Sequence, residues 1–180
     1  MERDEELARS LWPWLSERLA HVGERVLELE RELACGAGAG AALEDVRART
    51  EAFGWLVGCV AEALGGAQAS PRRAPAGLAW MVEALDAAAR ERGLPLRAEA
   101  PPPAAPGVTR GQAWECARVL WWLASATRGR VRVLAHERGW AIEGEDALDL
   151  ERAARAELPG RVTGGAAGWR WSAVAAEAAR

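Results

Sequence analysis

Apolar residues recur every three or four positions in two long stretches, residues 11–33 and 43–64. The first repeat falls at Leu15, Leu19, Val22, Val26, Leu29 and Leu33, and the second falls at Leu43, Val46, Phe53, Val57, Val60 and Leu64. Thr50 occupies the one gap in the second repeat. This spacing keeps an apolar seam of a helix facing a partner helix. Both stretches are therefore predicted to be long amphipathic helices.

The segment between the two stretches is rich in glycine, with Gly36, Gly38 and Gly40 in residues 34–40. Glycine breaks helices and permits a tight reversal, so the two helices are predicted to form an antiparallel hairpin. The polar residues 2–10 either precede the first helix, with Ser10 as its cap and Pro13 in its first turn, or form its frayed start. The first helix is expected to run to about residue 34, and the second over residues 41–64. A bare hairpin with an apolar seam usually dimerises into a four-helix bundle.

The rest of the chain alternates between helical and strand patterns. Gly65 and Gly66 end the second helix, and the Pro- and Ser-containing residues that follow are typical of a linker. The patterns then predict a helix at 77–92, an edge strand at 94–99, a proline loop at 101–106, a helix at 109–126, strands at 131–136 and 140–143, a helix at 147–158, a turn at 164–165 and a strand at 168–176.

These elements predict an α+β protein in three parts. Residues 1–66 form the hairpin of a dimeric four-helix bundle, residues 67–76 form the linker, and residues 77–180 form a small α/β sandwich.

Charge and composition limit the possible functions. The net charge of −3 gives no bulk attraction to nucleic acid or to an anionic membrane, and no apolar run reaches the ~18 residues of a membrane span. The acidic start of the chain does not have the pattern of a signal peptide, so we expect a cytoplasmic protein. Cys35, Cys59 and Cys116 are scattered and are predicted to be free thiols.

Three short segments resemble those of a known family. Residues 15–21, Leu-Ser-Glu-Arg-Leu-Ala-His, look like the histidine box of sensor histidine kinases. Residues 119–126 and 129–133 look like the helix that carries the N-box and the strand that follows it. The order of hairpin, linker and sandwich also resembles the core of these kinases, in which the sandwich is an ATPase-like domain of the GHKL type.

The differences from the kinases concern nucleotide binding. Trp121 and Ser125 stand where the kinases have asparagines that hold Mg²⁺ and nucleotide, and tryptophan cannot ligate a hard cation. Residues 143–148 lack the expected Asp-x-Gly-x-Gly motif. We therefore expect a degenerate GHKL-like domain that binds no ATP. Trp114, Trp121 and Trp122 are predicted to fill the former nucleotide pocket as core residues.

A histidine hairpin with a degenerate ATPase-like domain is similar to the ChpT-type histidine phosphotransferases and to the sporulation phosphotransferase of bacilli. The resemblance implies a homodimer that relays phosphoryl groups between His21 and the aspartates of response-regulator receiver domains. It implies no cofactor and no metal of its own, with Mg²⁺ supplied by the receiver. A hybrid histidine kinase is a further candidate partner.

The residues around His21 suit this role. Imidazole is a nucleophile near neutral pH, and His21 is predicted to lie on a flank of the helix beside the seam. Glu17 and Glu24, at i−4 and i+3, could bind its second ring nitrogen, and Arg18 and Arg25 could meet phosphoryl oxygens.

Two other functions remain open. The kinases usually have an acid directly after the histidine, whereas this chain has Val22. That residue favours a non-catalytic pseudo-kinase scaffold that dimerises and binds receiver domains or a kinase. A plain coiled-coil interaction protein with an unrelated second half is the third alternative. His136, at a predicted strand end, is expected to be structural.

Overall fold

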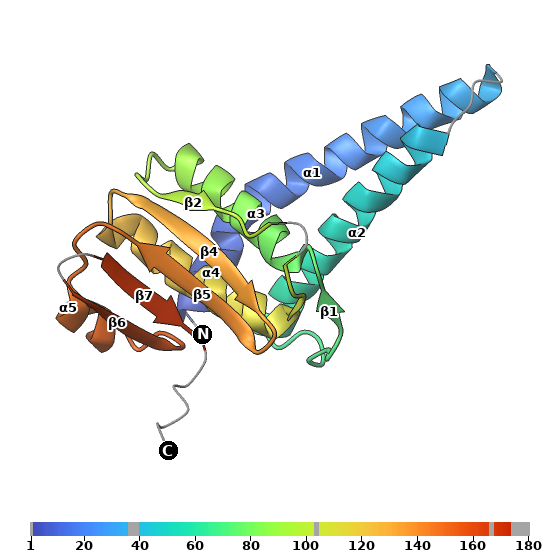
Figure 1. The fold of residues 1–180 in the computed structure, drawn as a ribbon. Coiled ribbons are helices and arrows are strands. Elements are labelled where there is room, and N and C mark those ends of the chain that lie inside the picture. Colours follow the sequence, from blue (N-terminus) through green and yellow to red (C-terminus); the bar gives the residue numbers. More distant parts are fainter. Residues whose placement is uncertain (1, 36–39, 103–104, 166–167, 174–180) are drawn as a thin grey trace.

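The computed structural model describes residues 2–35, 40–102, 105–165 and 168–173. A long hairpin, made of α1 (Glu2–Ala34) and α2 (Gly40–Ala63), projects from a lobe of helices and strands (Figure 1). This arrangement confirms the predicted α+β class and the helical hairpin. Residues 36–39 of the predicted reversal lie outside the described residues.

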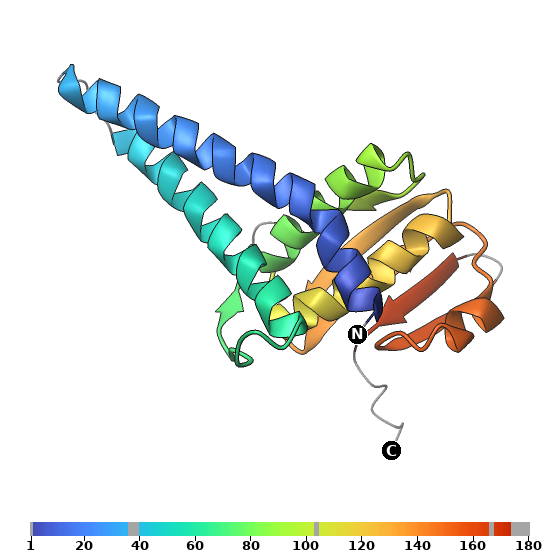
Figure 2. The ribbon, with the colours of Figure 1, turned by 180° about the vertical axis from the view of Figure 1, so that it is seen from behind.

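The predicted cap of α1 at Ser10 is wrong, and residues 2–10 belong to the helix. The helix begins at Glu2 and passes through Pro13, so Ser10 is not its cap; the Ser10 hydroxyl instead donates to the carbonyl of Glu6 at 2.7 Å. The first turns are helical because their apolar face packs on the lobe, where the start of α1 crosses α4 (Figure 2). The buried side chains of this segment are Leu7, Ala8, Leu11, Trp14 and Leu15.

Two helices form the framework of the lobe. Helix α3 (Gly77–Glu91) and helix α4 (Arg110–Ala126) match the predicted segments closely. A capping box fixes the start of α4: the Thr109 hydroxyl accepts from the Gln112 amide nitrogen at 3.3 Å, and the Gln112 side chain accepts from the Thr109 amide nitrogen at 3.0 Å. These helices cover one face of the main sheet.

The main sheet has five strands in the order β2-β4-β5-β7-β6. Strand β2 is parallel to β4, and the other neighbours are antiparallel. The strands are β2 (Arg97–Glu99), β4 (Arg130–His136), β5 (Gly139–Gly144), β6 (Arg161–Gly165) and β7 (Gly168–Ser172). The short β2 is an edge strand, as predicted.

Other predicted boundaries in the second half were wrong. Gly164 and Gly165 belong to β6 rather than to a turn. The last strand ends at Ser172, and residues 174–176 of the predicted strand lie outside the described residues. The helix predicted at 147–158 is shorter, α5 (Leu150–Arg155). The linker contains β1 (Arg73–Ala74), which pairs with β3 (Val108–Thr109).

The apolar core continues from the lobe into the base of the hairpin. Trp140, Ile142 and Trp171 fill the inner face of the sheet, and one cluster of buried residues joins them to the start of α1 and the end of α2. Trp55 of α2 lies so close to Gly77 that a Cβ atom there would be 2.4 Å from the indole. The base of the hairpin is thereby packed against α3.

The cysteines are free thiols, as predicted, with Cys35 exposed and the other two buried. Burial raises the pKa of Cys59 and of Cys116 far above the ordinary value for a thiol. Within the described ranges, no helix has the length and apolar character to cross a membrane.

Candidate functional site

His21 lies on the exposed flank of α1, about halfway along the projecting hairpin. Its side chain is 49% exposed, and its Nδ1 is 3.3 Å from Oε2 of Glu24, the i+3 neighbour. Among the described residues, Nε2 of His21 has no hydrogen-bond or ion-pair partner, and Glu17 makes no such contact with the ring. The structure therefore brings one of the two candidate carboxylates to His21 and leaves the other in solvent.

The two candidate arginines bind carboxylates instead of facing His21. The Arg18 guanidinium lies over the Trp14 ring, 4.9 Å from its centroid, and is 4.0 Å from a carboxylate oxygen of Glu83 on α3. Arg25 binds Glu28 and also Asp45 of α2, with Nε 3.2 Å from Oδ2 of Asp45. Arg25 therefore links α1 to α2 by a hydrogen bond, whereas Arg18 makes only a long, solvent-exposed ion pair with α3.

Asp45 is the centre of the link between α1 and α2. It accepts hydrogen bonds from Arg49 at 2.9 Å as well as from Arg25. The bond from Arg49 is the largest cause that lowers the pKa of Asp45, and the charge of Glu28 is the largest cause that raises the pKa of Arg25. Both shifts favour the charged forms of Asp45 and Arg25, so the link between α1 and α2 is an ion pair at neutral pH.

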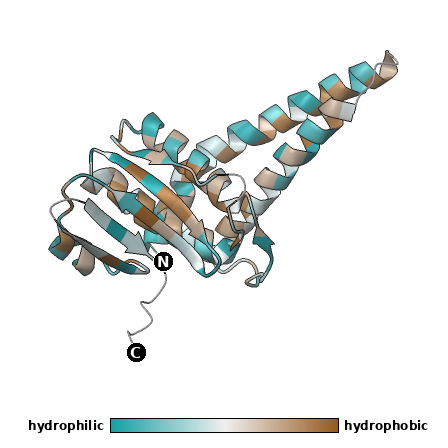
Figure 3. Ribbon diagram, in the orientation of Figure 1, coloured by the Kyte–Doolittle hydropathy of each residue, from teal (hydrophilic) through white to brown (hydrophobic). Residues whose placement is uncertain are grey.

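The predicted apolar seam divides into two rows in the structure. Leu15, Val22 and Leu29, seven residues apart, are buried or half-buried within the chain. The other row is exposed, and it consists of Trp12, Leu19, Val26 and Leu33, also seven apart. Helix α2 divides in the same way: Val46, Phe53 and Val60 are half-buried, whereas Leu43, Thr50, Val57 and Leu64 are exposed. Apolar positions recur along both arms of the hairpin (Figure 3).

The region of the predicted nucleotide pocket is only partly filled by indoles. Trp114 is buried and donates from Nε1 to Asp4 at 2.8 Å. Trp121 and Trp122 are only half-buried, and with Ser125 they line a cavity of about 470 Å³ next to the start of α1. Trp114 is thus a buried core residue, as predicted, whereas Trp121 and Trp122 pack against the core at its edge.

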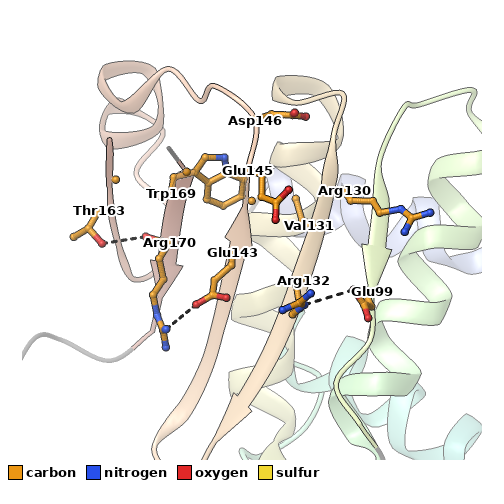
Figure 4. Close-up of a pocket in the computed structure, with 13 residues that line it drawn as sticks. Glu99, Arg130, Val131, Arg132, Glu143, Glu145, Asp146, Thr163, Trp169 and Arg170 are labelled. Carbon is orange, nitrogen blue, oxygen red and sulfur yellow. Dashed lines mark hydrogen bonds and ion pairs between the residues drawn. The ribbon is translucent and has the colours of Figure 1, made fainter. Parts of the chain in front are cut away.

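The outer face of the sheet carries a row of charges that sequence reasoning missed. Strand register aligns the charged residues Glu99, Arg132, Glu143 and Arg170 across four strands, and the uncharged Thr163 of β6 ends the row. Arg170 binds Glu143 at 2.7 Å, and Arg132 is 3.6 Å from Glu99 (Figure 4). The row lies beside a hollow of about 940 Å³, and only the correct pairing of β2, β4, β5 and β7 could have revealed it.

His136, the second histidine, lies at the end of β4 and is half-buried. Its Nε2 is 3.0 Å from a guanidinium nitrogen of Arg170. Since a guanidinium can only donate, Nε2 accepts this bond. His136 thus has the structural position expected at a strand end.

The part of the chain that the structure describes contains no group of three or more His, Cys, Asp or Glu residues arranged to hold a metal ion. That this protein has no cofactor or metal of its own stays a prediction.

No protein-family model matches this chain, and neither the curated proteins nor the solved structures include a match. The resemblance to histidine phosphotransferases therefore rests on the order of elements and on the short segments around His21 and in α4 and β4.

Proposed function

We propose that this protein is a homodimeric histidine phosphotransferase that relays phosphoryl groups between His21 and receiver-domain aspartates of response regulators, without ATP hydrolysis. The observation that carries the proposal is the geometry of His21, which is exposed on the hairpin with one ring nitrogen beside a carboxylate and the other directed at no residue of the described chain.

The carboxylate of Glu24 favours the tautomer with the proton on Nδ1, because a negative charge stabilises an N–H at that nitrogen. Nε2 then keeps its lone pair. In the transfer, Nε2 attacks the phosphorus of an aspartyl phosphate, an N–P bond forms, and the P–O bond breaks to release the aspartate. A second receiver's aspartate reverses these steps. The receiver is expected to bring the Mg²⁺ that its own acidic pocket holds.

The exposed rows on both helices support the homodimer. Leu19, Val26 and Leu33 leave apolar surface in water, as do Leu43, Val57 and Leu64 on α2. A second hairpin would bury both rows in a four-helix bundle. His21 is two residues beyond Leu19, which places it about 160° around the helix from the exposed row. Dimerisation would therefore leave the imidazole accessible to a receiver.

The lobe supports the GHKL-like assignment through its mixed five-stranded sheet with helices on one face. In this assignment α4 is the N-box helix, and Trp121 and Ser125 replace residues that hold nucleotide and Mg²⁺. We expect no tight binding of Mg-ATP, and a calorimetric titration that showed it would contradict this part of the proposal.

The chain contains only two histidines, which makes the experiment simple. Purified protein is incubated with receiver domains that carry labelled aspartyl phosphate, and transfer is followed on gels. The label should appear on the wild-type chain and on H136Q, and should be absent from H21Q. Equal labelling of H21Q and wild type would refute the proposal.

The alternative is a non-catalytic scaffold that dimerises and binds receiver domains or a hybrid histidine kinase. One structural observation favours it: Arg25 is committed to the carboxylates of Glu28 and Asp45 and so does not offer its guanidinium to a phosphoryl group at His21. The scaffold predicts that wild type and H21Q bind a receiver equally well and that neither accepts label.

A further inference from the structure

A cavity of about 470 Å³ lies where the start of α1, the second half of α4 and the end of α3 meet. Its volume falls within the range of ordinary small-molecule sites. Leu7, Leu94 and Leu158 form apolar walls, and the half-buried indoles of Trp121 and Trp122 complete them. The cavity is therefore large enough, and apolar enough, for the body of a small organic molecule.

Three arginines reach the same cavity, Arg3, Arg92 and Arg118, against a single lining carboxylate, that of Glu6. Arg3 donates to the carbonyl of Ala156 at 2.5 Å. The Nε of Arg118 is buried and forms an ion pair with Oδ1 of Asp4 at 3.4 Å. With Asp4 counted beside Glu6, the three arginines still outnumber the two carboxylates by one, so the cavity carries a small excess of positive charge.

Arg92 is the cation best placed for a ligand. Its guanidinium lies over the Trp121 ring, 5.3 Å from the centroid, and no carboxylate of the described residues forms an ion pair with it. This cation–π contact keeps the guanidinium beside the indole, and its N–H groups remain able to bind a carboxylate. Indole, guanidinium and apolar wall therefore converge on one volume.

We propose that this cavity binds a small anion with a flat apolar body, of the class of aromatic carboxylates. The carboxylate accepts from Arg92, and the ring system lies against the tryptophans and leucines. A charge-assisted bond from arginine to carboxylate is stronger than a neutral one, and the apolar walls favour a hydrophobic body over a free inorganic anion. The site does not involve His21, so it goes beyond phosphotransfer and can be tested independently of it.

The experiment titrates the full-length chain by calorimetry with three probes. 2-Naphthoate combines charge and flat body, 2-naphthylmethanol keeps the body without the charge, and acetate keeps the charge without the body. We expect 2-naphthoate to bind one site per chain, and the other two to bind at least tenfold more weakly. Absence of saturable naphthoate binding, or equal affinity for the neutral alcohol, would overturn the proposal.

Two variants locate the site. R92Q removes the proposed anion contact and should weaken naphthoate binding at least tenfold, because a charged hydrogen-bond partner is lost. R155Q is the control: Arg155 on α5 does not line the cavity, and it pairs with Glu151. R155Q should change the affinity less than twofold. Melting curves confirm that both variants fold, and equal effects of the two variants would contradict the assignment.

Discussion

The exposed row on α1 allows a quantitative test of dimerisation with the variant L19Q. Leu19 is 54% exposed in the single chain, so about half of its side chain remains to be buried by a second copy. Full burial of a leucine contributes about 1.5–3 kcal/mol, which gives ~1 kcal/mol for each copy. A two-fold dimer contains the substitution twice, so the loss is about 2 kcal/mol, or roughly 30-fold in the dissociation constant.

The chain supplies a matched control for this variant. Leu27 lies on the same helix and is 53% exposed, but it follows Val26 by one residue and so faces about 100° away from the exposed row. L27Q should leave the dimerisation constant nearly unchanged. Sedimentation equilibrium over a range of concentrations measures both variants, and circular dichroism checks that the hairpin remains helical. A monomeric wild type at tens of micromolar, or equal weakening by L27Q, would refute the four-helix bundle.

Three further predictions concern stability and reactivity. D45N should lower the melting temperature at neutral pH, because it removes the ion pairs of Asp45 that link the two helices. The pKa of Asp45 is lowered in the folded state, so the stabilisation by its carboxylate is present above the ordinary pKa of 3.8 and is lost as the pH falls through the folded pKa. The melting temperatures of wild type and D45N should therefore become equal in acid. In urea unfolding, Gly77→Ala should destabilise the protein by ~1–3 kcal/mol, because the new methyl group overlaps the buried indole of Trp55. G54A is the contrasting variant: the space around Gly54 is open, so alanine should stabilise α2 by up to ~1 kcal/mol in the same assay. A thiol reagent should modify Cys35 rapidly in the native protein and reach the two buried cysteines only on unfolding; rapid labelling of all three thiols would contradict their burial.

The helices were predictable because their signals are local. The spacing of apolar residues identified α2, α3 and α4. The pattern did not decide where α1 begins, because Pro13 and Ser10 resemble a helix start. Its true first turns depend on burial against α4 and α3, which a single sequence does not show.

The sheet was less predictable because strand pairing is not local. Gly164 and Gly165 are typical turn residues, but β6 forms through pairing with β7, where Gly164 lies opposite Trp169. A Cβ atom at Gly164 would lie 2.8 Å from the Trp169 backbone, so glycine at this position allows β6 and β7 to come close together. The charge row on the outer face depends on the pairing of β2 with β4 and of β5 with β7, which the sequence pattern does not show.

The surroundings of His21 were also predicted correctly only where the contacts are local along the helix. Helical spacing correctly predicted that Glu24 reaches the ring, because i and i+3 share a face. The same rule offered Arg18 and Arg25 as phosphate ligands, but their partners, Glu83 and Asp45, come from other helices. Tertiary contacts decided where these long side chains point.

The most direct test of the central claim is to map the phosphoryl group on the wild-type chain. After incubation with a phosphorylated receiver, the protein is digested with trypsin without acid, and its peptides are analysed by mass spectrometry. The account predicts phosphate on the peptide of residues 19–25, which contains His21. Phosphate on the peptide of residues 133–138, which contains His136, or on neither peptide, would contradict it.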